Sequence, residues 1–152
     1  MNPLTREWID KAEADYATPC RELRARKDPN YDGGCSHAQQ CAEKYLKAGL
    51  QEADVRFGKT RDLSALLGQI LLSHPEWETL RTAAKILTGY GVEFRYPGKW
   101  ADKMQARKAI EQCTHVRNLV RRSLGLPASP SRKRLGGTGR RKSAGKTRRN
   151  RR

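Results

Sequence analysis

Apolar side chains recur at steps of three and four positions along most of this 152-residue chain. This spacing places them on one face of an α-helix, whereas a half-buried β-strand would need sustained alternation of apolar and polar residues, which no window of the sequence shows. The length suits one domain, and the 36% of hydrophobic residues is enough for one modest core. We therefore expect an all-α fold, an up-and-down bundle of four to five helices with short connections.

The first predicted helix carries the apolar series from Trp8 to Leu23, with Thr5 as its N-cap. Pro19 should kink this helix or end its first part, because its ring clashes with the preceding turn and it lacks an N–H donor. Turn-forming residues at 27–34 then predict a loop.

Four further helices follow from the same spacing. We expect Gly89 and Gly91 to end the fourth of the five helices, and Gly125 and Pro127 to end the fifth. The predicted helices cover residues 35–52, from 60 or 61 to 73, from 75 to the glycine stop, and 100–124. Small residues in the helix at 35–52 favour close packing against a neighbouring helix; they are Ala38, Ala42, Ala48 and Gly49.

The net charge of +16 is concentrated at one end of the chain. Residues 127–152 hold 11 Lys and Arg and no acid, which leaves 21 basic and 16 acidic residues, a net +5, for residues 1–126. The basic segment has Gly, Ser and Pro in place of apolar residues, so it cannot bury enough surface to offset its chain entropy. We predict a helical domain over 1–126 and a disordered tail over 127–152 with nonspecific affinity for nucleic acid. Electrostatic docking of an interaction protein through this tail is the alternative.

No run of about 18 uncharged apolar residues occurs, and the start lacks the apolar stretch of a signal peptide, so we expect a soluble, cytoplasmic protein that enters no membrane. Cys20, Cys35, Cys41 and Cys113 form no CxxC pair and are expected to be reduced thiols. His37 lies near two of them, but the spacing does not match a structural zinc site, which needs four ligands. We expect neither a metal nor a cofactor.

Residues 36–50 read SHAQQCAEKYLKAGL. The order of a His-Ala start, a Gln-Gln pair, Ala-Glu-Lys and then Lys-Ala before a final Leu resembles the signature helix of the HEPN family, the helical domain named for nucleotide binding in higher eukaryotes and prokaryotes. The matching positions are His37, Ala38, Gln39, Gln40, Ala42, Glu43, Lys44, Leu46, Lys47, Ala48 and Leu50.

Two flanking segments agree with this resemblance, which covers roughly residues 5–125. Ala14 and Asp15 look like part of the family's Asp-bearing first helix, and residues 94–97, FRYP, look like its Arg-Tyr-Pro loop. Residues 60–63 depart from it, because they read TRDL where many relatives have Thr-His-Asp-Leu. Arg61 therefore stands in place of that His and could contact a phosphate.

The resemblance implies a HEPN-type nucleotide- or RNA-binding or regulatory module. Small proteins of this family partner a minimal nucleotidyltransferase, often in toxin–antitoxin pairs, and are usually dimers, so a homodimer with such a partner is expected. An Arg side chain offers paired donors to phosphate, and a Tyr ring can stack on a base. The candidates to line a nucleotide or RNA groove are Lys44, Lys47, Arg95, Tyr96 and Lys99.

The family also contains metal-independent RNases, whose signature is an Arg followed after four to six residues by a His. The three His residues of the chain have no Arg at that distance, and the nearest approach is Arg107 with His115, separated by seven residues. Arg117 and Asn118 resemble the opening of the motif, but the places where a His should follow are occupied by Arg122, Ser123 and Leu124. We therefore favour a role without catalysis and keep an RNase that uses Arg107 and His115 as the alternative.

Two ion pairs are also predicted. Glu43 and Lys47 are four residues apart on one helix, in the favourable order for a salt bridge. Asp15 could pair with Arg95 across the bundle. We expect a structural role for Asp15, because one carboxylate without a partner acid, His or metal supports no reaction class.

Overall fold

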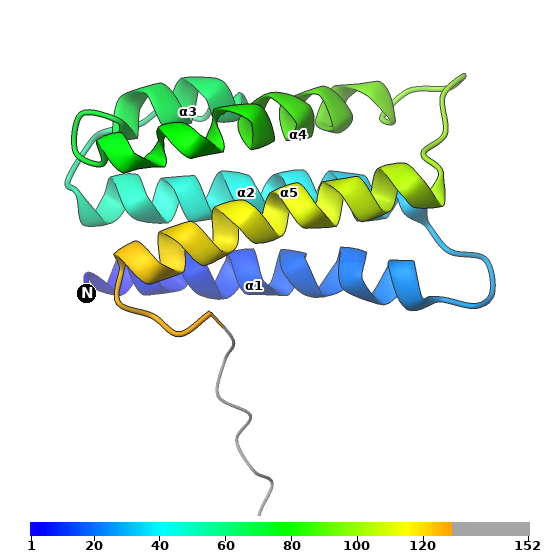
Figure 1. The fold of residues 1–152 in the computed structure, drawn as a ribbon, viewed down its shortest axis with the longest axis horizontal. Coiled ribbons are helices and arrows are strands. Elements are labelled where there is room, and N and C mark those ends of the chain that lie inside the picture. The colour runs from blue at the N-terminus through cyan, green and yellow to red at the C-terminus, as the bar shows by residue number, and fades with distance from the viewer. Residues whose placement is uncertain (129–152) are drawn as a thin grey trace, which may run out of the picture.

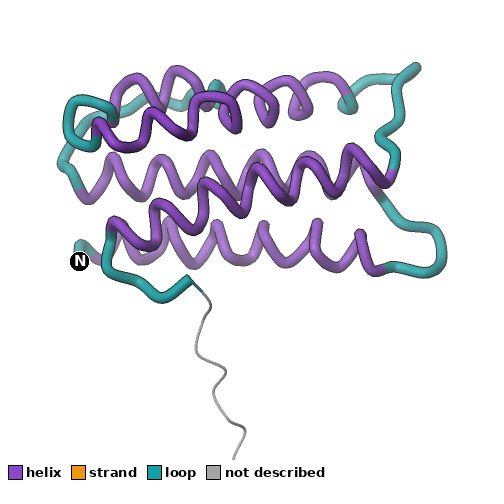
Figure 2. The backbone as a smooth tube through the Cα atoms, viewed as in Figure 1, coloured by secondary structure: helices purple, strands orange, loops and turns teal. Residues whose placement is uncertain are grey.

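The structure is a computed structural model that describes residues 1–128. The regular elements of this part of the chain are all helices, joined by loops and without a strand (Figure 2), which confirms the predicted all-α class. The elements in chain order are α1 (Pro3–Arg24), α2 (Tyr31–Glu52), α3 (Leu63–Ile70), the 3-10 helix η1 (Pro75–Leu80), α4 (Arg81–Glu93) and α5 (Lys103–Ser123).

Helix α2 lies at the centre of the bundle and packs against α1, α3, α4 and α5 (Figure 1). Six consecutive residues, 45–50, are buried, so this stretch of α2 is surrounded on all sides. Small side chains make such packing possible, as predicted. At Gly49 even a methyl group would overlap the buried ring of Trp77 from η1.

Helix α1 begins earlier than predicted and runs through its proline. Asn2 is the N-cap, since its side chain accepts a hydrogen bond of 2.8 Å from the N–H of Leu4, while Thr5 is buried inside the helix. The expectation that Pro19 ends the first part of the helix is wrong, because α1 continues to Arg24. Pro19 is buried where Gly34 of α2 brings its backbone close, so packing against α2 stabilises this turn.

Helix α4 continues through both glycines that were expected to end it. It ends at Glu93, and the stretch before it, residues 75–80, is a 3-10 helix rather than the first turn of an α-helix. Gly91 has a packing reason to be a glycine, because a Cβ there would lie 3.0 Å from Cγ of Gln39. The missing side chain thus permits close approach of α4 to α2, and tertiary packing outweighs the low helix propensity of glycine.

The fifth helix starts at Lys103, after a capping box formed by Asp102 and Gln105. Trp100 therefore precedes the helix, and the bundle does not cover it. Trp100 is 83% exposed and Met104 is 76% exposed, although both fall on the apolar spacing that predicted a buried stripe. The buried stripe of α5 begins instead at Ala106.

The first residues of the predicted tail pack on the bundle. Arg121 donates a hydrogen bond of 2.6 Å to the carbonyl oxygen of Pro127, and Arg117 donates one to the carbonyl oxygen of Ala128. The predictions made for the rest of the tail fall on residues 129–152 and lie outside the described residues. Over residues 1–128, no helix has the length and apolarity needed to cross a bilayer.

Candidate functional site

A groove lies where α2, the residues before α3, and the end of α4 meet. Its volume is about 250 Å³, and a second hollow of about 280 Å³ continues it and shares Ser36, Gly91 and Arg95. The residues that line the first part are Ser36, Gln39, Arg61, Asp62, Thr88, Gly91, Val92 and Arg95.

Gln39 of the signature helix forms the floor of this groove. The residue is only 5% exposed, and its Nε2 donates hydrogen bonds of 3.1 Å to the carbonyl oxygen of Arg61 and 3.4 Å to Oε2 of Glu43. Both amide hydrogens are thus engaged, while Oε1 accepts no hydrogen bond from residues 1–128. The side chain is fixed in place and keeps an acceptor for a ligand.

Arg61 and Arg95 bring positive charge to the groove from two separate connections. Both residues are exposed, and neither forms a salt bridge within residues 1–128. The acids nearby are engaged as caps and turns. Asp62 accepts from the N–H groups of Ser64 and Ala65 at the start of α3, and Asp32 accepts a hydrogen bond of 2.6 Å from the N–H of Ala101. The two guanidinium groups are therefore left to attract an anion.

The chemistry that this groove supports is binding. Its lining offers two guanidinium groups, one buried amide, and the hydroxyls of Ser36 and Thr88, whereas no His lines it. Thr88 Oγ1 accepts from the N–H of Leu63 at 3.2 Å and so keeps its own hydrogen for donation. Donors of this kind suit phosphate oxygens and sugar hydroxyls.

His37 and Lys44 of the signature helix face α1. Nδ1 of His37 lies 2.9 Å from Oδ1 of Asp15, and Lys44 forms an ion pair with Oδ2 of the same carboxylate. The predicted pair of Asp15 with Arg95 is therefore wrong. Helix α2 separates the two residues, since Asp15 lies between α1 and α2 while Arg95 follows α4 on another face of α2.

The predicted salt bridge between Glu43 and Lys47 is confirmed, with 2.7 Å between Oε1 and Nζ. Lys47 is buried, and its Nζ lies 5.6 Å from the centre of the Trp8 ring. Gln40 donates a hydrogen bond of 3.2 Å to the hydroxyl of Ser36. The structure thus engages Lys44 and Lys47 in ion pairs within the bundle.

Of the five candidates for a nucleotide or RNA groove, Arg95 alone is among the residues that line this one. Tyr96 and Lys99 lie beyond its end on the connection from α4 to α5, where both are exposed. Lys99 Nζ lies 3.6 Å from Oε1 of Glu93. Arg61, which the sequence suggested as a phosphate contact, lines the groove together with Arg95.

Arg107 and His115 are both exposed on α5, and with seven residues between them they lie eight positions apart. Eight residues of α-helix correspond to a rise of about 12 Å, so the two side chains of one protomer do not converge on a single phosphate. Arg117, the residue that resembles the opening of the RNase motif, is buried and bound to Glu13.

Sequence reasoning missed a polar cluster in which the partly exposed Glu13 joins the buried Tyr45, Arg117 and Arg121. Tyr45 donates to Glu13, and Arg121 Nη1 donates to the Tyr45 hydroxyl at 3.1 Å. Burial would raise the pKa of the Glu13 carboxyl, but the hydrogen bonds from Arg117 and Tyr45 outweigh it, and the pKa is lowered. The signal in the sequence is that Arg117 lies four positions after the buried Cys113 and three before the buried Val120, and that Arg121 lies four positions after Arg117.

Comparison with known proteins places this fold in a family. The chain matches the family model of the HEPN domain over residues 5–123. Among solved structures, it resembles the crystal structure of TT1696 from Thermus thermophilus, with a TM-score of 0.66 and 24% sequence identity over 78% of this chain and 96% of that chain, which is a likeness of fold. No curated protein matches the chain. Because the family match spans α1 through α5, the chain belongs to the HEPN domain family.

Proposed function

We propose that this HEPN-type protein is a nucleotide- or RNA-binding module that holds phosphate in the groove between Arg61 and Arg95. The observation that carries the proposal is the pair of exposed arginines without a carboxylate partner in residues 1–128, placed on one groove with the buried amide of Gln39. An anion that enters this groove meets two positive charges, and the neighbouring carboxylates are already engaged in hydrogen bonds.

The binding energy would come mainly from charge-assisted hydrogen bonds. Each such bond contributes about 1.5–3 kcal/mol, or roughly 10- to 150-fold in affinity. The guanidinium plane offers paired donors that match the oxygens of a phosphate group. Gln39 would add an acceptor for a sugar hydroxyl or a base amino group, which distinguishes a nucleotide from an inorganic anion.

The same geometry disfavours the RNase alternative within one protomer. Strand cleavage at a ribose 2′-hydroxyl needs a proton acceptor beside the phosphate-binding group, and no His lines the groove. Arg107 and His115 lie on α5 and are not among the lining residues. Binding without cleavage therefore accounts best for the arrangement.

Calorimetric titration of the full chain with AMP and ATP at a fixed salt concentration tests the proposal. We expect Arg61→Ala and Arg95→Ala each to weaken binding at least about tenfold, and the matched control Arg6→Ala, which removes an exposed arginine of α1, to leave it unchanged. Equal weakening by all three variants would show a nonspecific charge effect instead. Degradation of RNA without added metal that His115→Ala abolishes would replace the binding proposal by the RNase alternative.

A regulatory role beside a nucleotidyltransferase, which the sequence resemblance implies, extends this proposal. Such a partner handles nucleotides, so a shared nucleotide would occupy the groove at Arg61 and Arg95. Copurification of the two proteins, compared between the native chain and the Arg61→Ala variant with and without ATP, tests this extension.

A further inference from the structure

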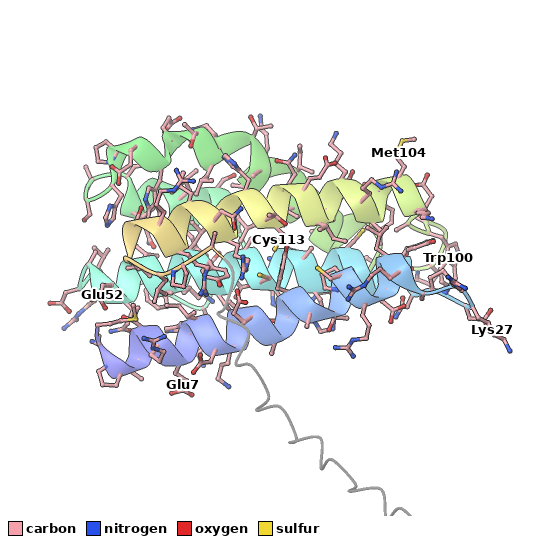
Figure 3. All side chains as sticks on the ribbon, turned by 60° about the horizontal axis from the view of Figure 1, so that its bottom comes forward. Glu7, Lys27, Glu52, Trp100, Met104 and Cys113 are labelled. Atoms are coloured by element: carbon pink, nitrogen blue, oxygen red, sulfur yellow. The ribbon has the colours of Figure 1, made fainter. Side chains whose placement is uncertain are left out.

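The connection from α4 to α5, with the adjoining turns of both helices, exposes four large apolar side chains. Val92 is 60% exposed, Tyr96 65%, Trp100 83% and Met104 76%. Single exposed apolar residues are ordinary on a protein surface, but these four, within thirteen positions of the chain, mark a candidate binding surface, here called the patch. Figure 3 shows Trp100 and Met104 at the same end of the bundle, with side chains directed away from its core.

Positive charge surrounds this patch. Arg95, Lys99, Lys103 and Arg107 are exposed and alternate with the apolar residues along the chain. The carboxylate of Asp102 accepts from the N–H of Gln105 as the N-cap of α5, and Glu93 faces Lys99 at 3.6 Å. The patch is therefore cationic, and its ligand should be an anion with flat apolar parts.

Single-stranded nucleic acid has this chemistry. Its phosphates are attracted to Lys and Arg, and every base has a face that can stack on an exposed aromatic ring without regard to sequence. A protein interface would also be rich in Tyr, Trp, Met and Arg, but Lys99 and Lys103 favour nucleic acid, because Lys is depleted in protein interfaces. The patch also continues the groove, since Arg95 lines both hollows and Tyr96 follows it directly.

We propose that Tyr96 and Trp100 form a stacking platform for single-stranded nucleic acid, reached from the phosphate groove through Arg95. This inference rests on the proposed function, because a nucleotide phosphate in the groove sets the register of the strand. The neighbouring nucleotides then leave the groove past Arg95, and their bases stack on the two exposed rings while Lys99 and Lys103 face the backbone. Recognition by stacking is tolerant of sequence.

The fluorescence of Trp100 gives a direct test. The chain has three tryptophans, of which Trp77 is fully buried and Trp8 is partly buried against Phe57. Titration of the full chain with a 12-nucleotide oligouridylate should quench the emission of Trp100. Trp8→Phe should keep this quenching, and Trp100→Phe should lose it while it retains most of the affinity, because a smaller aromatic ring still stacks.

Truncation of the ring should cost affinity. Trp100→Ala should weaken oligouridylate binding on the order of tenfold, the effect of one lost stacking contact. The matched control is Leu72→Ala, which removes a 94% exposed apolar side chain from the α3–η1 connection at the opposite end of the bundle (Figure 1) and should have no effect. Absence of quenching, or equal affinity of Trp100→Ala and the native chain, would overturn the platform.

The outcomes separate this inference from the proposed function. If Arg61→Ala abolishes AMP binding while Trp100→Ala leaves oligouridylate binding intact, phosphate binding in the groove is supported and the stacking platform is excluded. If Trp100→Ala weakens oligouridylate binding while Arg61→Ala leaves AMP binding unchanged, the stacking platform is supported and phosphate binding in the groove is excluded. If Trp100→Ala converts a dimer to a monomer in sedimentation without changing affinity, the patch is a surface between copies of the chain and the platform is excluded.

Discussion

Arg117 of α5 donates two hydrogen bonds to the carboxylate of Glu13 on α1, from Nε to Oε1 at 2.6 Å and from Nη2 to Oε2 at 3.1 Å. This fork joins two helices through residues that are 104 positions apart in sequence. The guanidinium of Arg117 is buried, and its carbon lies 4.8 Å from the centre of the Tyr16 ring. A charge in this position depends on Glu13, because bulk water does not solvate it.

Removal of the Glu13 charge should destabilise the fold. We expect Glu13→Gln to lower the free energy of unfolding by about 3 kcal/mol, because it leaves the buried Arg117 without its counter-charge. Urea denaturation measures the change. The control is Glu78→Gln, which breaks the ion pair with Arg81 on the surface, where both side chains are more than half exposed, and should have a much smaller effect. Equal effects of the two substitutions would show that burial adds nothing to the Glu13 pair.

Acid should remove the contribution of Glu13. The pKa of its carboxyl is lowered in the folded state from its ordinary value of 4.5, so between the two pKa values the unfolded chain binds more protons than the folded one. The stabilisation is therefore present above pH 4.5 and lost as the pH falls through the lower, folded-state pKa. Urea midpoints of the native chain and Glu13→Gln should approach each other as the pH falls below about 4.5. A constant difference down to the acid transition would contradict this assignment.

Two helical glycines should respond oppositely to alanine. Gly49→Ala should lower the free energy of unfolding by about 1–3 kcal/mol, because the new methyl group would overlap the buried ring of Trp77. Gly68→Ala in α3 meets no atom within 4 Å and should raise stability by about 0.5–1 kcal/mol through lower entropy of the unfolded chain. Thermal unfolding checks both. A stabilising Gly49→Ala would mean that α2 and η1 can separate without cost.

The groove offers a second matched pair within α4. A methyl group at Gly91 would lie 3.0 Å from Cγ of Gln39, whereas one at Gly89 meets no atom within 4 Å. Gly91→Ala should therefore displace the Gln39 amide and weaken AMP binding several-fold. Gly89→Ala should leave AMP binding unchanged and stabilise the helix by about 0.5–1 kcal/mol. Calorimetric titration of both variants with AMP separates the effect of the Gln39 position from that of the helix propensity of α4. Identical AMP affinities of the two variants would show that Gln39 does not contribute to the site.

Sequence reasoning succeeded where the information is local. The spacing of apolar residues predicts helix because each helical side chain meets its own chain neighbours three and four positions away, and the Glu43–Lys47 salt bridge follows the same rule. The predicted helix ends at Gly91 and Pro19 were wrong. Each residue lies inside a helix because α2 packs against it, through Gln39 at Gly91 and through Gly34 at Pro19. Local propensity is a weak term that tertiary packing overrides.

The amino-acid sequence by itself determined the all-α class, the signature helix and the concentration of positive charge in residues 127–152. The tertiary structure decided which face each helix presents to which neighbour. In the folded chain Asp15 pairs with His37 and Lys44 rather than with Arg95. Arg117 is buried, and Trp100 is exposed. Spacing along a helix assigns a side chain to a face, but the residue that meets that face depends on how distant segments pack, and this is why the groove between Arg61 and Arg95 became visible only in three dimensions.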